Sequence, residues 1–407
     1  MNKLKLISIV CALCVLLGTC VNASSKHLPI GSDQSKFNIC DMGATPNDGI
    51  DDTLAFKLTL NAGEPVYVPP GVYNISESLY INSNMLIGAG TDKTIIVANM
   101  ESTRKPIVWA GDRAQIRDIT FKFADSCITG TEIAGERVGI VTTADGDRRL
   151  CRGAAITNVR LQNVGTGLYS PNAEVVNAAK SEGDGTAFSV TFESISVIDF
   201  SYRGIDMQAG LRTGNVYRNI YLSSGKYKAN AAFAMGSEES ESAIADITIV
   251  DSKLKVAAKF EETYGASITN MNIINTELTE NNTAFLYLSQ SVLLIDGLTV
   301  QNSAPKGARQ AFIRVGEGAY KKSLVYDTCG LLKINNFSIL NDEIEEIPDA
   351  AQYMLSRDNA YIHGFVVNIK NFNVSASEAI KKQYESFKFD NRAITLSVNG
   401  KKLAGGK

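Results

Sequence analysis

The stretch Ile268-Thr-Asn270-Met271-Asn-Ile273 contains the pattern that decides the fold. An apolar residue lies two positions before a small polar residue, and apolar residues lie one and three positions after it. The pattern occurs nine times, with Asp118, Asn158, Ser194, Asn219, Asp246, Asn270, Gly297, Asn336 and Asn371 in the middle position. From Ser194 the central copies follow at 25, 27 and 24 residues, and the outer copies are 35 to 40 residues apart. Such spacing is typical of a repeat with insertions.

One copy of the pattern describes two short strands joined by a one-residue bend. The residue types at the bend tolerate the left-handed backbone that a sharp turn requires. A unit of roughly 25 residues cannot bury its apolar side alone, so units must stack with like residues about 4.8 Å apart. The sequence therefore predicts an all-β chain folded as a single-stranded, right-handed parallel β-helix. A β-sandwich is the alternative, but it needs frequent two-residue hairpin turns, and we find one, at Asn399-Gly400.

Residues 1–23 have the composition of a secretory signal peptide. A basic start leads into an apolar stretch, Leu6 to Leu17, that is too short to span a bilayer, and small residues precede Ser24. We expect the mature chain to begin at Ser24 and to be secreted or periplasmic, without a membrane span. Lipoprotein anchoring at Cys20 is the less favoured alternative.

Four of the seven cysteines lie beyond this segment, in a compartment where disulfides form. Cys127 and Cys151 bracket the long insertion of the first clear coil, so we expect a disulfide bond between them. The alternative is that these thiols are buried at stacking positions of the core.

Residues 37–97 contain a different series of motifs. Phe37-Asn-Ile-Cys-Asp-Met-Gly-Ala44 is followed by Asp48-Gly-Ile-Asp-Asp-Thr53, Pro69-Pro-Gly-Val-Tyr73 and Gly88-Ala-Gly90. This series resembles the N-terminal signature of the pectate-lyase-like superfamily, in the branch of rhamnogalacturonase-type and pectate lyase 3-type proteins and phage tailspike depolymerases. Met42 replaces an aromatic residue of that pattern. The resemblance implies a parallel β-helix that acts on polysaccharide, and it identifies no catalytic residue.

Both ends of the predicted β-helix, residues 24–378, are expected to be capped. Asp51, Asp52 and Thr53 predict the start of a short helix that covers the first coil, with Leu54, Phe56, Leu58 and Leu60 as its apolar side. The three aspartates Asp48, Asp51 and Asp52 are better explained by capping and turns than by a cation site. Residues 379–407, which begin with a helical stretch and continue with a short strand, are expected to cap the other end.

The second strand of each unit predicts which side chains point outward. Alternation places two columns inside, namely Ile205, Phe233, Ala258, Leu286 and Ile313, and then Met207, Met235, Phe260, Leu288 and Val315. The outer column between them is Tyr169, Asp206, Ala234, Lys259, Tyr287 and Arg314, and beside it run Gln208, Gly236, Glu261, Ser289 and Gly316.

The resemblance implies that a ligand lies along such a face. Aromatic faces suit pyranose rings and cations suit uronate carboxylates, so we expect an acidic polysaccharide as partner. The candidate catalytic residues are Asp206, Lys259, Glu261 and Arg314. The candidate substrate-binding residues are Tyr169, Arg203, Gln208, Arg212, Glu238 and Tyr287. A plain solvated sheet face is the alternative reading of the same mixture.

The reaction type stays open at this point. A β-eliminating lyase needs a cation and a base, for which Lys259, Tyr287 and Arg314 qualify, whereas a hydrolase needs two carboxylates such as Asp206 and Glu261. A non-catalytic polysaccharide-binding protein is the alternative to both. Trp109 is either a core residue or a sugar platform.

The other classes of ligand are less favoured. The net charge of −3 argues against nucleic acid. With two histidines in the chain we expect no metal site and no cofactor, although calcium bound by Asp145, Asp147 and Asp184 stays an alternative. The oligomeric state, monomer or side-by-side trimer, is open.

Overall fold

The computed structural model describes residues 37–142, 150–170, 186–208, 212–236, 239–316, 330–347, 352–357, 365–389 and 394–404 of the 407-residue chain. The predicted signal peptide with Cys20, the substrate-binding candidate Glu238, and the aspartates of the calcium alternative lie outside these ranges.

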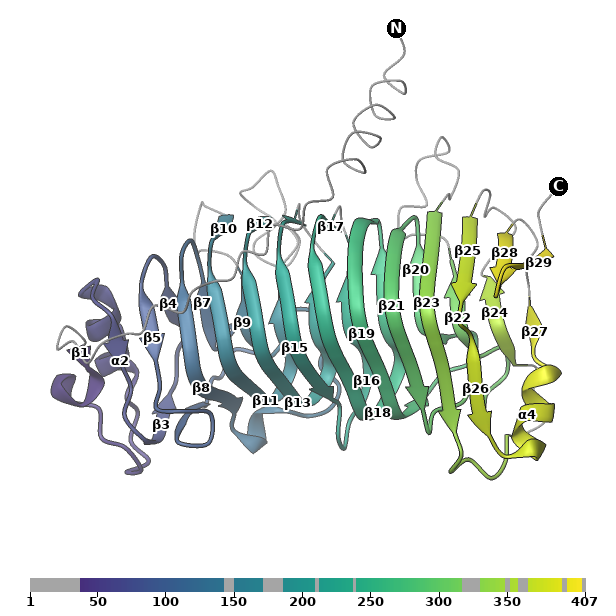
Figure 1. Ribbon diagram of the computed structural model, residues 1–407. Coiled ribbons are helices and arrows are strands. Elements are labelled where there is room, and N and C mark those ends of the chain that lie inside the picture. Colours follow the sequence, from purple (N-terminus) through teal and green to yellow (C-terminus); the bar gives the residue numbers. More distant parts are fainter. Residues whose placement is uncertain are drawn as a thin grey trace, which may run out of the picture. The chain divides into compact units, whose positions relative to one another are not determined.

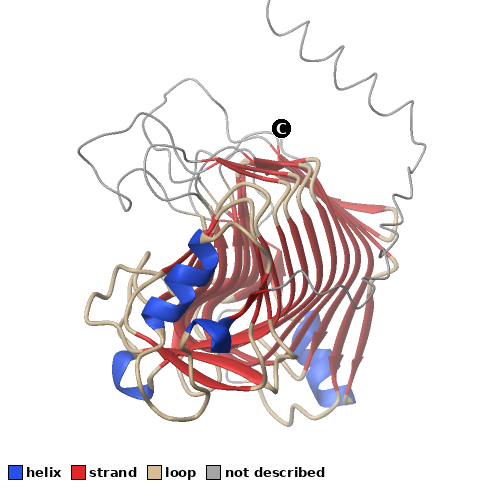
Figure 2. Cartoon of the chain, turned by 90° about the vertical axis from the view of Figure 1, so that its left-hand side faces the viewer, coloured by secondary structure: helices blue, strands red, loops and turns tan. Residues whose placement is uncertain are grey.

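The described strands wind into coils with three faces, and like strands of successive coils pair side by side (Figures 1 and 2). The first face pairs β1 (Phe37–Asn38), β2 (Val66–Tyr67), β5 (Met85–Ile87), β8 (Gln115–Phe123), β11 (Ala155–Tyr169), β13 (Thr191–Met207), β15 (Val216–Ser223), β18 (Ala243–Glu261), β19 (Thr263–Leu278), β21 (Val292–Gln301), β23 (Gly330–Asn341), β25 (Phe365–Lys370) and β28 (Ile394–Val398).

The second face follows the bend. It consists of β3 (Gly71–Ile75), β6 (Thr94–Ala98), the continuing parts of the long strands from β8 to β23, and β26 (Asn373–Ala376). The third face consists of β4 (Leu79–Ile81), β7 (Val108–Ala110), β9 (Val138–Val141), the ends of β11 and β13, β16 (Lys228–Met235), the end of β18, β20 (Ala284–Ser289), β22 (Ala311–Val315), β24 (Tyr353–Arg357) and β27 (Lys388–Phe389).

A short ladder at the corner after the third face contains β10 (Leu150–Arg152), β12 (Thr186–Phe188), β14 (Arg212–Thr213), β17 (Glu239–Ser240) and the start of β19. Every strand pairing named so far is parallel. The predicted all-β parallel β-helix is therefore confirmed, and the β-sandwich is excluded.

The nine predicted bend residues all have the left-handed backbone, with φ between 49° for Asn158 and 87° for Gly297. Their side chains also bond from coil to coil. The Nδ2 atom of Asn270 donates to Oδ1 of Asp246 at 3.0 Å, and Nδ2 of Asn371 donates to Oδ1 of Asn336 at 2.9 Å. The bend thus supplies both the turn and a bonded column along the outside of the stack.

A second column of left-handed residues lies five positions after the first and was not predicted. It contains Asn163, Asp199, Asp251, Asn275 and Asn302, with φ from 46° to 56°. Here too a side chain bonds across coils, because Nδ2 of Asn275 donates to Oδ1 of Asp251 at 3.1 Å. This second bend turns the chain from the second face toward the third.

The core fills the interior of the coils with stacked apolar side chains. Both predicted inner columns are buried, with exposed fractions of 0 to 1%. Aromatic rings contact one another within and between coils, since Phe233 contacts Tyr217 of its own coil and Phe260 of the next, with centroids 6.1 and 6.0 Å apart. Burial of this kind is the main favourable term in the folding of the stack.

The predicted N-terminal helix is present as α2 (Thr53–Asn61), at the end of the stack that faces the viewer in Figure 2. A 3₁₀ turn, η1 (Ile39–Met42), precedes it. Only half of the predicted apolar side is correct: Phe56 and Leu60 are buried, whereas Leu54 and Leu58 are 68% and 51% exposed. The reason is that residues four apart share a helix face, so positions 54 and 58 lie opposite positions 56 and 60.

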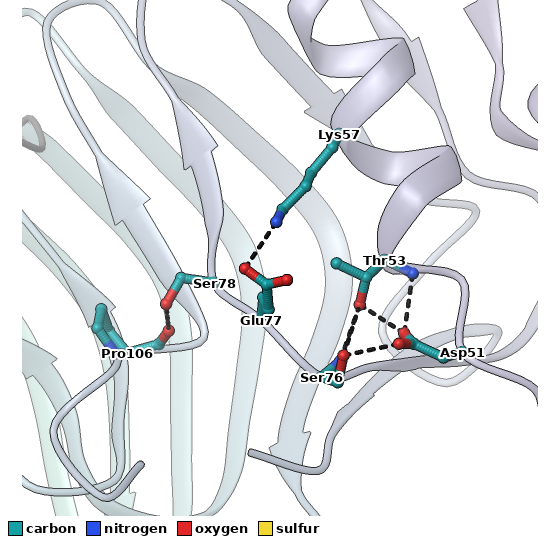
Figure 3. Close-up of polar contacts among 7 residues, drawn as sticks. All are labelled: Asp51, Thr53, Lys57, Ser76, Glu77, Ser78 and Pro106. Carbon is teal, nitrogen blue, oxygen red and sulfur yellow. Dashed lines mark hydrogen bonds and ion pairs between the residues drawn. The ribbon is translucent and has the colours of Figure 1, made fainter. Parts of the chain in front are cut away.

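Polar contacts fasten α2 to the first coils (Figure 3). Asp51 accepts hydrogen bonds from the amide of Thr53 at 3.0 Å, the Thr53 hydroxyl at 2.5 Å and the Ser76 hydroxyl at 2.6 Å. Lys57 pairs with Glu77 at 2.7 Å. Asp52, the residue just before α2, makes no capping bond to the helix, and its carboxylate accepts instead from the amides of Thr45 and Asn74. The aspartates of this segment therefore hold turns against the first coil.

The C-terminal residues form α4 (Glu378–Glu385), with Ser377 accepting from the amide of Ile380, and then β27 and β28. Residues 379–407 were expected to form a cap, yet β27 and β28 within them still pair in parallel with β24 and β25 as the coils do. The departure comes at Asn399-Gly400, where both residues have positive φ and β29 (Lys401–Ala404) folds back antiparallel on β28. This is the two-residue hairpin turn noted in the sequence.

The predicted disulfide bond between Cys127 and Cys151 is wrong, since both thiols are free. Cys127, in the 3₁₀ turn η2 (Asp125–Cys127), lies near the carbonyl of Ala98 at the end of β6, whereas Cys151 lies near the carbonyl of Gly111, just after β7. The length of β7 separates these two corners. The two cysteines bracket the insertion in sequence, but they do not come together in space.

The left-handed backbone at Asn270 predicts that glycine is tolerated better than alanine at this position. Asn270→Ala should lower the free energy of unfolding by about 1 kcal/mol more than Asn270→Gly, because a Cβ is disfavoured at positive φ. Urea denaturation followed by circular dichroism measures both variants against the parent chain. Equal stability of the two variants would contradict this role of the bend.

The bonds to Asp51 lower its pKa, although partial burial opposes the shift. A lowered pKa stabilises the folded chain above the ordinary carboxyl value of 3.8, and this contribution disappears as the pH falls through the lower, folded value. Asp51→Asn should therefore cost about 1 kcal/mol at neutral pH and progressively less below that ordinary value. Denaturation midpoints from pH 7 down to acid test it, with Glu64→Gln, at an exposed carboxylate, as control.

Free thiols predict a specific labelling pattern. Cys127 and Cys151 should both react with N-ethylmaleimide after unfolding without reductant. In the folded chain Cys151 should stay unlabelled, because burial and the nearby Asp112 raise the pKa of its thiol to about 12. Peptide mass spectrometry reads the result, and a Cys127–Cys151 crosslinked peptide would contradict the structure.

Candidate active site on the third face

The predicted outer column is present on the third face, rung above rung. Register pairs Tyr169 with Asp206, Asp206 with Ala234, Ala234 with Lys259, Lys259 with Tyr287, and Tyr287 with Arg314. The column is longer than predicted at both ends. We define the outer ladder as Tyr80, Trp109, Val141, Tyr169, Asp206, Ala234, Lys259, Tyr287, Arg314 and Ser356.

Two ion pairs form the charged centre of this ladder. Nη1 of Arg203 lies 2.9 Å from Oδ2 of Asp206, and Nζ of Lys259 lies 2.8 Å from Oε2 of Glu261. Gln208 joins them, since its Oε1 accepts from Arg203 and its Nε2 donates to Glu261 at 2.7 Å. The structure thus brings five of the predicted site residues into one bonded network.

The network continues toward the next rungs of the ladder. The ammonium of Lys259 lies 5.9 Å from the ring centre of Tyr287, within cation–π range. Arg314, one rung further, donates from Nη1 to the hydroxyl of Ser356 at 3.4 Å. Lys259, Tyr287 and Arg314 therefore form a cation, an aromatic ring and a cation on consecutive rungs.

Burial strengthens the electrostatics of this network. The side chains of Arg203 and Asp206 are 12% and 4% exposed, and those of Lys259 and Glu261 are 22% and 15% exposed. Burial opposes the charge on Arg203, but Asp206, Tyr202 and Glu261 outweigh it and raise the pKa of Arg203 above its usual value. Because removal from water strengthens Coulomb interactions, these pairs hold their geometry better than surface pairs do.

The remaining predicted residues lie apart from the network. Arg212 is fully buried and donates from Nη1 to the carbonyls of Met207 and Gly236, so it supports the backbone of the corner. Tyr169 is on the ladder but is 5% exposed and packs with Val138 and Val141.

Several residues of the site were missed from sequence, and Trp109 was noted there without being assigned to the ladder. Oδ1 of Asn230 accepts a hydrogen bond from Nε of Arg203 at 3.1 Å. The ring centre of Tyr202 lies 4.9 Å from the Cζ atom of Arg203. Tyr80 and Trp109 occupy two rungs of the ladder. The sequence does indicate the positions of Tyr80 and Trp109, because Leu79-Tyr-Ile and Val108-Trp-Ala repeat the apolar–aromatic alternation of Leu168-Tyr169.

The insertion before β9 is braced from within by Glu132, which is 8% exposed. The carboxylate of Glu132 accepts from the amides of Thr129 and Gly130 and from the hydroxyl of Ser201 on β13. These bonds outweigh the effect of burial and lower the pKa of Glu132. The carboxylate therefore fastens this insertion to the strand that carries Arg203 and Asp206.

Other kinds of site find less support in the part of the chain that the structure describes. In those ranges no group of three or more His, Cys, Asp or Glu side chains is arranged to hold a metal ion. Nor does any helix there have the length and apolar character needed to cross a membrane. A hollow of about 310 Å³ lies at another corner, between Asn275, Glu277 and Lys306, and contains no residue of the outer ladder.

Comparison with known proteins places this geometry in context. The model of the family described as rhamnogalacturonase A/epimerase, pectate lyase-like, matches residues 36–283, which include Arg203, Asp206, Lys259 and Glu261 and end before Tyr287. No curated protein matches the chain.

Solved structures share the fold at low sequence identity. The A-module of the mannuronan C-5 epimerase AlgE6 of Azotobacter vinelandii superposes with a TM-score of 0.60 and 17% identity, covering 89% of this chain and 98% of that one. The catalytic domain of a GH87 α-1,3-glucanase, solved with nigerose, superposes with a TM-score of 0.56 and 15% identity, covering 86% of this chain and 68% of that one. The gp42 tailspike of Acinetobacter phage vb_AbaP_AS12 superposes with a TM-score of 0.55 and 12% identity, covering 92% of this chain and 65% of that one.

Proposed function

Because the chain belongs to the rhamnogalacturonase A/epimerase family of pectate-lyase-like proteins, we propose that it binds an acidic polysaccharide along the outer ladder and cleaves it by β-elimination. The observation that carries this proposal is the sequence of Lys259, Tyr287 and Arg314 on three consecutive rungs. Two cations about 10 Å apart flank one phenol, since each rung rises about 4.8 Å. The composition of residues 1–23 supports action outside the cytoplasm.

The chemistry of β-elimination matches these three side chains. A base takes the proton from C5 of a uronate, its electron pair forms the C4=C5 double bond, and the C4–O glycosidic bond breaks as the leaving oxygen takes up a proton. Negative charge develops on the uronate carboxylate, so a cation beside it lowers the barrier. We assign the binding of the uronate carboxylate to Lys259 and Arg314, and the transfer of the C5 proton to Tyr287.

Asp206 and Glu261 take positioning roles in this scheme. Each carboxylate is paired with a cation, Asp206 with Arg203 and Glu261 with Lys259. A carboxylate so engaged is suited to orient a cation and poorly suited to deliver a proton to a leaving group. The glycoside-hydrolase mechanism, which needs two such carboxylates for acid and base work, is therefore the less favoured reaction.

Binding without cleavage is the second candidate function. It is favoured by the pairing of the charged groups with one another, Arg203 with Asp206 and Lys259 with Glu261, because paired groups are less suited to proton transfer. A protein of this kind would hold an extracellular polysaccharide, with the ion pairs maintaining the shape of the face.

One incubation experiment separates these functions. The purified chain is mixed in D₂O with polygalacturonate, with alginate and with a neutral glucan. Ultraviolet absorbance of the unsaturated product, new reducing ends, and deuterium at C5 by NMR are then followed together. Absorbance and reducing ends should rise together on an acidic polymer.

The other outcomes would each overturn the proposed reaction. Reducing ends without absorbance would establish hydrolysis and return attention to Asp206 and Glu261. Deuterium at C5 with inverted configuration and without new ends would establish epimerisation, which shares the first proton transfer. Retention of the chain on an immobilised polymer, with none of these changes, would establish the binding function.

Substitutions on the ladder should affect turnover and binding differently. Tyr287→Phe should lower kcat about 100-fold or more with little change in KM, because it removes the group assigned to proton transfer. Lys259→Ala should raise KM and lower kcat together. Steady-state kinetics on the cleaved polymer test both.

Tyr221→Phe is the matched control for the first of these variants. Tyr221 is a 39% exposed tyrosine on β15, in register with Ser196 and Thr248 and remote from the outer ladder. Full activity of Tyr287→Phe would rule out the assigned proton transfer, whereas a loss in both tyrosine variants would point to a general effect on folding.

A further inference from the structure

The outer ladder divides into two parts of different chemistry. Its rungs from Asp206 to Arg314 carry the ion pairs described above. Its first rungs are Tyr80, Trp109, Val141 and Tyr169, none of which carries a formal charge at neutral pH. Since both parts lie in one register, a polymer that follows the charged rungs toward the N-terminal end of the stack reaches the aromatic ones.

The two outermost aromatic side chains form an ordered pair. The rings of Tyr80 and Trp109 lie 3° from parallel with centroids 6.3 Å apart. Trp109 packs against the buried cluster of Val138, Val141 and Tyr169, which holds it in place. Tyr80 is 44% exposed, so the pair is supported from beneath and open to solvent at one end. Large rigid rings of this kind provide contact area at low entropic cost.

We propose that Tyr80 and Trp109 form a remote sugar subsite, which contacts the apolar face of a pyranose ring in the same polysaccharide chain that reaches Lys259. This inference rests on the proposed function of the ladder. Trp109 and Lys259 are five register steps apart, or about 24 Å at the usual strand spacing. Only a chain several sugars long spans that distance. The protein therefore selects long polymers over short oligomers, because contacts far from the reacting bond contribute to transition-state binding.

The one tryptophan of the chain provides a direct signal for this subsite. Trp109 fluorescence is recorded during titration with oligogalacturonates and oligomannuronates of increasing length. Long oligomers should change the emission and bind more tightly, whereas the shortest ones should leave the emission unaltered. The same series is used as substrate, and kcat/KM should rise with length until both parts of the ladder are spanned.

Truncation of the exposed ring should remove this dependence on length. Tyr80→Ala should lower kcat/KM for long oligomers about tenfold, so that the ratio of long to short approaches one. Trp109→Phe, which keeps a ring on the buried cluster, should show a smaller loss. Tyr221→Ala, which removes an exposed tyrosine on another face, should keep the length dependence of the parent chain.

Failure of the subsite and failure of the proposed function give different results. If the parent chain turns over long and short oligomers equally, or if Tyr80→Ala retains the length dependence, the subsite is disproved while the function of the charged rungs stands. If none of the polymers is bound or altered by the parent chain, the proposed function and the subsite fail together.

Discussion

The left-handed residue at the first bend is the constraint on which the rest of the structure depends. Each such residue turns the chain within one position, so the strands before and after it keep a constant relation in every coil. Residues 24 to 40 positions apart in sequence consequently come to lie directly above one another. The side-chain bonds between Asn270 and Asp246, or Asn371 and Asn336, strengthen the same column that the backbone creates.

The charged rungs show what this regularity makes possible. Arg203 on β13, Gln208 just after it, and Lys259 and Glu261 on β18 form one connected network, because the two strands are in fixed register with β16 between them. Partly buried ion pairs contribute little net stability, because desolvation offsets their attraction. Here the pairs orient side chains, since each charged side chain holds its neighbour in one position along the face.

The sequence predicted the fold and the outer column well, because both follow from short-range periodicity. The nine bend residues and both inner columns were identified from alternation alone. The second bend was missed although the sequence marks it. Leu161-Gln-Asn163-Val164 and Val197-Ile-Asp199-Phe200 have apolar residues two positions before and one position after the polar residue, as at the first bend. Helical periodicity was misapplied at Leu54 and Leu58, which alternate as in a strand although they lie on a helix.

The candidate site was harder to predict, because its partners depend on distances that periodicity does not determine. Arg203 bonds to Asp206 and Asn230 because the strands place these side chains next to one another. Arg212 is buried because the chain around it places two backbone carbonyls within reach of its guanidinium. Spacing in sequence likewise misled the pairing of Cys127 with Cys151, which lie at opposite ends of the third face. Tyr80 was overlooked, and Trp109 was noted without a place on the ladder, because the column was read from the central repeats outward and stopped at Tyr169.

The antiparallel hairpin at Asn399-Gly400 has a consequence for the behaviour of the protein in concentrated solution. A parallel β-helix can in principle grow without limit, since its last coil offers the same row of backbone donors and acceptors as every coil before it. The strand β29 reverses direction and occupies part of that row on β28. At β28 a neighbouring molecule that approaches end to end therefore meets β29 in place of the open parallel edge on which a further coil would form.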